Sequence, residues 1–306
     1  TAISGAVPVV TAWIAGASGL PAAYRPVTDV LAEVLAALLV VLAWRFHRGR
    51  LAVAALLVAA TNLLLRGPLA GAETGAGEPL LGLLLPLTLA ALALLPERPL
   101  ARPQTLVLAA VVLIEAWLTL ALARGAPAPG LLAAPELGRM VFLLAGAFVT
   151  LAFAARRGAF EGSLLWVLAA GALALLGDRG PQAATLACAA AQLVLLVGLV
   201  EDSYRLAYHD ELTGLPGRRA LEEALRTLDG ELAVAMVDVD HFKNFNDRHG
   251  HAAGDQALRM VAAELAKVGG GGRPFRYGGE EFAVLFPGPA IAAAHSALEE
   301  VRASIA

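Results

Sequence analysis

The stretch Pro-Phe-Arg-Tyr-Gly-Gly-Glu-Glu-Phe-Ala-Val-Leu-Phe, residues 274–286, decides the fold of the C-terminal third of the chain. Two short runs of strand-forming residues, 274–277 and 281–286, flank Gly278, Gly279 and Glu280. Consecutive glycines between short strands predict a tight hairpin turn, at which a phosphate can approach the backbone. We therefore expect an α/β domain with a mainly antiparallel central sheet.

Upstream of the hairpin, residues 232–239 form a short apolar run that ends in Asp238-Val239-Asp240. Carboxylates at the end of a buried strand lie at its edge, where a cation and phosphates can be met, although many such ends are merely solvated. Glu280, directly after the glycines, could complete a divalent-metal site with Asp238. Magnesium suits this sparse set, because it uses one or two carboxylates together with water and substrate phosphates.

Polar residues fill 241–255 on a short helix and loop, and an amphipathic helix follows to residue 268. Before the first strand, residues 210–219 form a Gly/Pro turn that leads into a helix with Leu221 and Leu225 on one face. The order of elements is therefore helix, strand, two helices and hairpin.

Residues 276–282, Arg-Tyr-Gly-Gly-Glu-Glu-Phe, resemble the signature of the GGDEF family of diguanylate cyclases in its GGEEF form. Three more motifs stand in family order: Asp-Glu-Leu-Thr at 210–213, the segment 238–243, and the segment 246–255. The resemblance covers about residues 205–306. It implies a nucleotidyl-cyclase, or palm-like, domain that condenses two GTP into cyclic di-GMP and two pyrophosphate. Each domain holds one GTP, so activity requires a homodimer through this domain.

The resemblance also implies roles for single residues. Asp238 and Glu280 would bind Mg²⁺ (or Mn²⁺) through their side chains, and Val239 through its carbonyl. Glu281 would assist metal binding or deprotonate the attacking hydroxyl, so the catalytic residues are Asp238, Glu280 and Glu281. The substrate contacts are Lys243 with the backbone near His241 and Phe242 for the phosphates, Asn246 and Asp255 for the guanine, and Gly278 and Gly279 beneath the nucleotide.

Three features depart from the family pattern. Gly217 stands where the family usually has Asn, which we expect to affect the turn more than the chemistry. Residues 269–272 are all glycine where many members carry an Arg-x-x-Asp product-inhibition site, so we infer that this inhibition is absent. The family domain normally continues some tens of residues past Ala306, a truncation that could leave the chain as printed inactive.

The first 200 residues have a different character. The chain is 58% hydrophobic and only 16% charged, and nearly all of the apolar blocks precede residue 201. A membrane-crossing helix needs about 20 apolar residues. Seven stretches approach that length: 29–45, 51–66, 79–96, 104–124, 139–156, 163–178 and 182–201. Residues 3–20 are apolar but broken by Gly and Pro, and are an eighth span or an interfacial piece.

Arginines in alternate loops indicate the orientation, because positive residues are retained on the cytoplasmic side. One set comprises Arg45, Arg48, Arg50, Arg98, Arg102, Arg156 and Arg157, whereas the opposite loops combine isolated arginines with carboxylates. We therefore expect a multi-pass inner-membrane protein with a cytoplasmic C-terminal domain. The expected domains are a polytopic all-α transmembrane bundle at 1–201, a helical linker at 202–209 that continues the last span unbroken, and the GGDEF domain at 210–306.

Polar residues inside the spans are candidates for function. Glu33 lies near a span end, where it could reach the interface, whereas Glu115 lies mid-span and is a candidate sensing residue. We expect Asn62 and Gln192 to form hydrogen bonds between helices.

Two other function classes remain open besides the membrane-embedded cyclase. One is a catalytically inactive GTP-binding receptor, against which the intact carboxylates argue. The other is a transporter or channel, which the few polar residues in the spans disfavour. Nucleic-acid binding is not expected, because a net charge of −3 provides no basic field.

Overall fold

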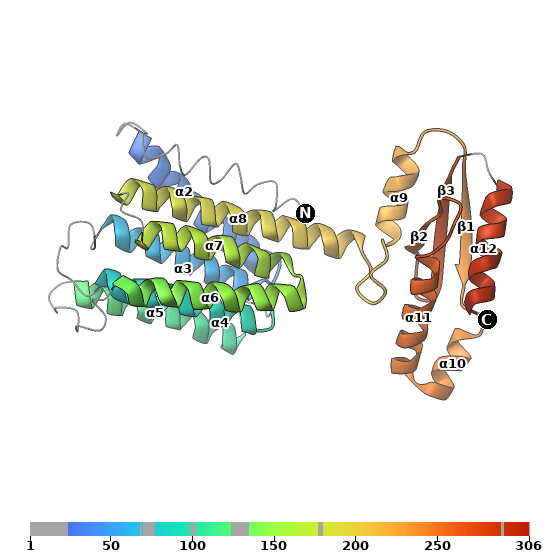
Figure 1. The fold of residues 1–306 in the computed structure, drawn as a ribbon, viewed down its shortest axis with the longest axis horizontal. Coiled ribbons are helices and arrows are strands. Elements are labelled where there is room, and N and C mark those ends of the chain that lie inside the picture. The colour runs from blue at the N-terminus through green and yellow to red at the C-terminus, as the bar shows by residue number, and fades with distance from the viewer. Residues whose placement is uncertain are drawn as a thin grey trace. The chain divides into compact units, whose positions relative to one another are not determined.

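The computed structural model describes residues 24–67, 69, 77–97, 99, 102–123, 135–176, 180–288 and 291–305. The chain divides into two compact units between Asp202 and Ser203. The first unit is helical, and the second combines helices with a sheet (Figure 1).

Seven helices make up the described part of the first unit. They are α2 (Arg25–Arg45), α3 (Gly49–Arg66), α4 (Gly77–Leu94), α5 (Pro103–Ala123), α6 (Pro135–Arg156), α7 (Ala159–Leu176) and α8 (Gly180–Tyr208). All seven are long and apolar enough to cross a membrane by length and composition. The expected number of long apolar helices is confirmed for the described residues, and the segment 3–20 lies outside them.

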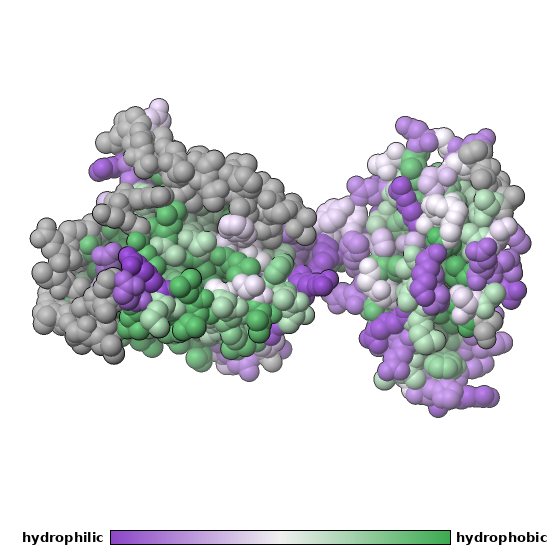
Figure 2. Space-filling view, viewed as in Figure 1, coloured by the Kyte–Doolittle hydropathy of each residue, from purple (hydrophilic) through white to green (hydrophobic). Residues whose placement is uncertain are grey.

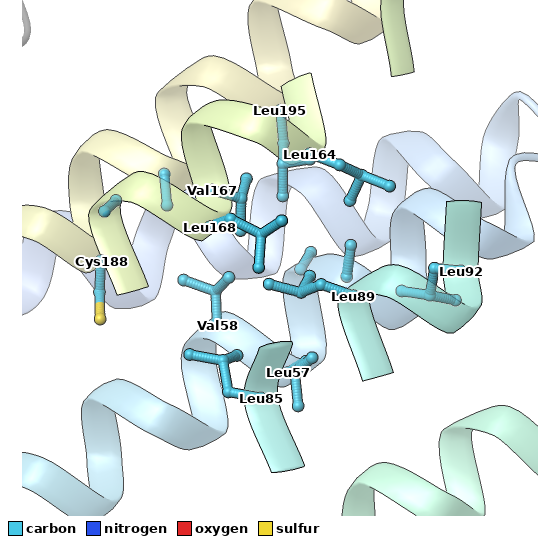
Figure 3. Close-up of a cluster of buried hydrophobic side chains, with 14 of the residues drawn as sticks. Leu57, Val58, Leu85, Leu89, Leu92, Leu164, Val167, Leu168, Cys188 and Leu195 are labelled. Carbon is cyan, nitrogen blue, oxygen red and sulfur yellow. The ribbon is translucent and has the colours of Figure 1, made fainter. Parts of the chain in front are cut away.

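The core of the helical unit is aliphatic. Figure 3 shows leucine and valine side chains from α3, α4, α7 and α8 converging on one cluster. Leu89, Leu164 and Leu195 are fully buried there. Small residues let the helices approach closely: a Cβ added at Gly171 would lie 2.8 Å from Leu85 Cδ2. Packing of this kind holds helices together whether water or lipid surrounds them.

The outer faces of the helical unit are apolar as well. In both α5 and α6, only 17% of the most apolar 18-residue segment is buried. The mean hydropathy of these segments is nevertheless high, 2.4 in α5 and 2.0 in α6. Leu113, Trp117 and Leu143 are among the exposed side chains. Figure 2 accordingly shows hydrophobic residues over much of the visible surface of this unit. An exposed apolar surface this extended marks a site of contact with a membrane or with other proteins.

Helix α8 continues without a break past the end of its apolar part to Tyr208. Because no Pro or Gly interrupts residues 199–208, the backbone hydrogen bonds carry on into the second unit. The expected unbroken helix is thus confirmed, with its end one residue before His209.

The second unit contains α9 (Arg218–Thr227), β1 (Leu232–Asp238), α10 (Phe242–His249), α11 (His251–Leu265), β2 (Arg273–Arg276), β3 (Glu281–Pro287) and α12 (Ile291–Ile305). Its described strands form one antiparallel sheet in the order β1-β3-β2. The expected antiparallel sheet and the hairpin of β2 and β3 are therefore confirmed.

Strand β3 lies in the middle of the sheet, and both of its faces are buried. Phe282, Val284 and Phe286 pack with side chains of α10, α11 and α12, whereas Ala283 and Leu285 pack with α9 and β2. This alternation follows from the two-residue period of a strand. It holds β3 between two layers of helices, so the hairpin that precedes it has a rigid base.

Candidate active site

The end of β1 lies beside the Gly-Gly-Glu-Glu hairpin. In the register of β1 with β3, Asp238 stands opposite Glu281, and Val237 opposite Phe282. Residues directly opposite in an antiparallel pair have Cβ atoms about 5 Å apart. Two carboxylates in that position repel each other unless a cation lies between or near them. The strand pairing therefore concentrates negative charge at one corner of the sheet.

Backbone hydrogen bonds close the hairpin tightly. The amides of Tyr277 and Gly278 both donate to the carbonyl oxygen of Glu281, at 2.9 and 3.1 Å. The Glu281 side chain folds back over the turn, since a Cβ added at Gly278 would lie 2.8 Å from its Oε2. Glycine at 278 thus leaves room for the Glu281 carboxylate, and Gly279 at the tip is exposed.

The residues at this corner supply only some of the oxygen ligands that a magnesium ion needs. Among the described residues, no group of three or more His, Cys, Asp or Glu side chains could hold a metal ion. Asp238 is exposed and Glu280 half-buried, so both carboxylates are accessible to a ligand. Mg²⁺ prefers one or two carboxylates with water and substrate phosphates, which this pair and the Val239 carbonyl can accommodate.

A sharp bend joins β1 to α10. His241 has a φ of 55°, in the left-handed region, and the Phe242 amide donates to the Val239 carbonyl at 3.3 Å. The bend brings the first turn of α10 next to the strand end. Free amides at a helix N-terminus attract phosphate. Lys243 lies on this turn and is exposed.

Asn246 and Gly254 meet where α10 turns into α11. Gly250, with a φ of 81°, makes the turn between the two helices, and its amide donates to the Asn246 carbonyl at 2.8 Å. A Cβ added at Gly254 would collide with the Asn246 side chain. Asn246 Oδ1 is buried with no hydrogen-bond partner in the structure. A buried acceptor without a partner is a candidate for a hydrogen bond from a ligand donor such as a guanine N–H. Asp255, next to Gly254, is exposed.

Replacing Gly254 with Ala tests this contact. The added methyl displaces the Asn246 amide, so we expect the apparent Kd for GTP to rise about tenfold, the effect of losing one or two hydrogen bonds. The measurement is GTP binding to the full chain by equilibrium dialysis. Ala253→Gly, one position away on the same helix, is the control. Unchanged affinity in Gly254→Ala would remove Asn246 from the nucleotide site.

Arg276 is a residue of the site whose role the sequence did not reveal. Its Nε and Nη2 donate to the carbonyls of Gly278 and Gly279, at 3.2 and 2.7 Å. Its Nη1 forms an ion pair with Asp210 Oδ1 at 2.6 Å. Arg276 thus fastens the turn of 210–213 to the hairpin, 66 residues away. In the sequence, the only indication of this contact was that Arg276 and Asp210 both belong to motifs that resemble the GGDEF family.

Asp210 organises its turn through three hydrogen bonds. Besides Arg276, the Thr213 amide and hydroxyl donate to Asp210 Oδ1, at 2.8 and 2.7 Å. Burial by itself raises the pKa of Asp210, but the hydrogen bonds from Arg276 and Thr213 outweigh it and hold the pKa below its ordinary value. The carboxylate therefore stays charged at neutral pH and positions the hairpin.

Two departures from the family pattern lie in turns. Gly217 precedes α9 with extended backbone, and its amide donates to the Tyr208 carbonyl at 2.7 Å. No side chain caps α9 there, so the change from Asn concerns the turn. Gly270 and Gly271 have φ values of 63° and 74°, which favour glycine over other residues.

Asn62, Gln192 and Glu115 of the helical unit have partners on neighbouring helices. Asn62 Nδ2 donates to Glu33 Oε1 at 3.1 Å, and Gln192 Nε2 to the Ala55 carbonyl at 2.9 Å, which confirms both expected interhelical hydrogen bonds. Glu33 also pairs with Arg66 at 3.4 Å. Glu115 is buried and accepts a hydrogen bond from Thr88, while its Oε2 has no partner.

The second unit is similar in sequence to a known protein family. Residues 207–306 match the family described as "Diguanylate cyclase, GGDEF domain". Diguanylate cyclase DgcP of Pseudomonas aeruginosa is 45% identical over 115 residues, 35% of this chain and 17% of the relative. Diguanylate cyclase VdcA of Vibrio cholerae is 41% identical over 103 residues, 32% of this chain and 30% of the relative.

A solved structure matches over the same part. It is the coiled coil and GGDEF domain of DgcB from Caulobacter crescentus in complex with c-di-GMP, with 36% identity, a TM-score of 0.32, and coverage of 35% of this chain and 60% of that one. The chain thus spans less than a third of the two curated relatives, and the family rests on the sequence match. By sequence, residues 207–306 of the chain are thus identified as a GGDEF domain.

Proposed function

We propose that this chain is a membrane-bound diguanylate cyclase that converts two GTP into cyclic di-GMP and two pyrophosphate. The observation that carries the proposal is the β1–β3 register, in which Asp238 stands opposite Glu281 beside the hairpin of Gly278, Gly279 and Glu280. The named activity of DgcP and VdcA, whose matching parts are 45% and 41% identical to this chain, supports it.

In each half-reaction the ribose 3′-oxygen of one GTP attacks the α-phosphorus of the other. The new P–O3′ bond forms, the bond between the α-phosphorus and the bridging oxygen breaks, and pyrophosphate leaves in line. A bound Mg²⁺ would polarise the α-phosphate and make the 3′-hydroxyl more acidic. In this chain, Asp238, Glu280 and the Val239 carbonyl would hold that ion, and Glu281 would take up the proton of the hydroxyl.

Other residues of the chain orient the nucleotide. Lys243 and the backbone near His241 and Phe242 would hold the phosphates, since they lie at the start of α10, next to the end of β1. Asn246 and Asp255 would bind the guanine edge, and the two glycines of the hairpin would let the nucleotide lie against the backbone. Each domain then carries one GTP, so two copies must meet face to face, and the enzyme works as a homodimer.

The helical unit would anchor the enzyme in the inner membrane. Support comes from the low burial of α5 and α6, whose exposed leucines and Trp117 form a surface suited to lipid. Arginines gathered in alternate loops favour the orientation in which the GGDEF domain is cytoplasmic. The bundle would then act as a sensor, with α8 as the connection to the cyclase domain.

The test is turnover by the full protein in lipid nanodiscs. The sample is incubated with Mg²⁺ and GTP, and cyclic di-GMP and pyrophosphate are quantified by chromatography. We expect two pyrophosphates for each cyclic di-GMP, a specific rate that rises with protein concentration as dimers form, and no product from Glu280→Ala. A folded, dimeric sample that binds GTP and forms no product would overturn the enzyme and favour the GTP-binding receptor.

A further inference from the structure

A cavity of about 380 Å³ opens at one end of the helical unit, between the first turns of α2, the last turn of α3 and the first turns of α8. Its polar lining consists of Arg25, Asp29, Arg66, Gln182 and Thr185. The first turns of α2 and α8 lie at the same end of this unit in Figure 1. Cavities of this volume hold small organic ligands.

One arginine of the cavity is already paired with carboxylates. Arg66 forms ion pairs with Asp29 at 3.0 Å and with Glu33 at 3.4 Å. Both carboxylates therefore have a cationic partner, whereas Arg25 has no ion pair with any described residue.

The unused groups of the cavity are hydrogen-bond donors. Among the described residues, Arg25 has one hydrogen bond, a long one of 3.4 Å from Nε to Gln182 Oε1. Its two terminal nitrogens therefore have no described partner. Gln182 Nε2 is buried and has no hydrogen-bond partner in the structure. A buried N–H without an acceptor is unfavourable unless a ligand supplies one.

A guanidinium and an amide N–H side by side match a carboxylate. Arginine binds carboxylates through two parallel hydrogen bonds, and the positive end of the α8 dipole adds to the attraction. We propose that this cavity binds a small carboxylate-bearing solute, and that binding shifts α8 and thereby changes the rate of the cyclase domain. The second half of this proposal rests on the proposed function, whereas the binding itself does not.

The coupling follows from the continuity of α8. Pro181, Gln182 and Thr185 in its first turns line the cavity, and the same helix runs unbroken to Tyr208 in the second unit. A ligand that binds one position of α8 more tightly than another shifts the population toward it. In the proposed orientation the cavity is at the extracytoplasmic end, so an external solute reaches it directly.

The binding experiment uses the full protein in nanodiscs and three probes, acetate, succinate and citrate, with succinamide as the uncharged counterpart of succinate. Binding is measured by isothermal titration calorimetry. We expect saturable binding of at least one carboxylate, none of succinamide, and affinity about tenfold weaker in Arg25→Gln, the loss of a charged hydrogen bond. Arg25 is exposed, so this variant should fold. Gln182→Glu, which turns a donor into a negative charge, should bind still more weakly.

Arg139→Gln is the matched control. Arg139 is also exposed, near the start of α6, and among the described residues its ion pair is the local one with Glu136 at 2.8 Å. Binding unchanged in Arg25→Gln and Gln182→Glu, or no binding of any of the three carboxylates, would overturn the site. Cyclic di-GMP formation is then measured with and without the bound carboxylate. A bound carboxylate that leaves the rate of an active enzyme unchanged would overturn the coupling, whereas an inactive enzyme with intact binding would overturn the proposed function alone.

Discussion

Asp238→Asn should reduce cyclic di-GMP formation by about a thousandfold or more, because catalysis of phosphoryl transfer depends largely on stabilising charge at the reacting phosphate. Asp238 ends β1 opposite Glu281, where the sheet register leaves it exposed. Asparagine keeps the size of the side chain and removes the negative charge that would hold a divalent ion. Because the residue is exposed, the substitution should leave the fold of the domain intact.

Asp240→Asn is the matched control, since Asp240 is also exposed and lies two residues further along, outside the strand. Both variants are assayed across a range of Mg²⁺ and Mn²⁺ concentrations, and hydrogen exchange of residues 273–287 checks that the sheet is formed. We expect Asp240→Asn to retain most of its activity. Equal activity of the two variants at saturating Mg²⁺ would remove Asp238 from the proposed metal site.

Arg50→Ala should destabilise the helical unit by about 3–5 kcal/mol, the effect of removing one partner from a buried ion pair. The guanidinium of Arg50 pairs with Glu97 and with Glu161, both at 3.1 Å. It also donates to the carbonyl of Leu95 at 2.8 Å and lies over the Phe160 ring. One side chain near the start of α3 thereby ties together α3, the segment after α4, and α7.

Burial explains the size of this effect. The Glu161 side chain is only 4% exposed, and its other partner, Arg156, is 3.4 Å away and more exposed. Without Arg50, the buried Glu161 carboxylate keeps only the longer contact with Arg156, the Leu95 carbonyl loses the Arg50 donor, and water has little access to replace it. The loss of hydrogen bonds would then be added to the loss of the ion pair.

Tryptophan fluorescence can follow unfolding of this unit selectively, because Trp13, Trp44, Trp117 and Trp166 all precede residue 202. Denaturation of the full protein is compared in mild detergent for Arg50→Ala and Arg139→Ala. Arg139 has an exposed pair with Glu136, so its loss should change the free energy of unfolding by less than about 1 kcal/mol. Similar stability of the two variants would mean that the Arg50 network contributes little.

Much of the architecture was predictable because it depends on local patterns. Seven apolar stretches predicted seven long helices, and the absence of Pro or Gly after residue 199 predicted that α8 continues to about residue 209. Gly278 and Gly279 predicted the hairpin, because consecutive glycines between two short strands favour a tight turn. The family motifs indicated which carboxylates to consider, and their roles stay predictions.

Other features were not predictable from local patterns. Arg50 and Arg156 were counted only as loop charges that set the orientation, but both contact Glu161. Arg276 was read only as part of a signature, but its ion pair with Asp210 holds the hairpin against a distant turn. The cavity between α2, α3 and α8 had no sequence signal, because its lining comes from residues as far apart as Arg25 and Gln182.

The sequence by itself determined the elements of this protein: where helices and strands form, which segments suit a membrane, and which motifs the second unit carries. The spacing of hydrophobic residues, the positions of glycines and the local charge determine these elements over a few residues. They can therefore be recognised from the sequence alone. Only the tertiary structure decided which side chains meet. Arg50 and Glu161 are 111 residues apart, and their contact exists because helix packing brings the first turn of α3 against the first turn of α7.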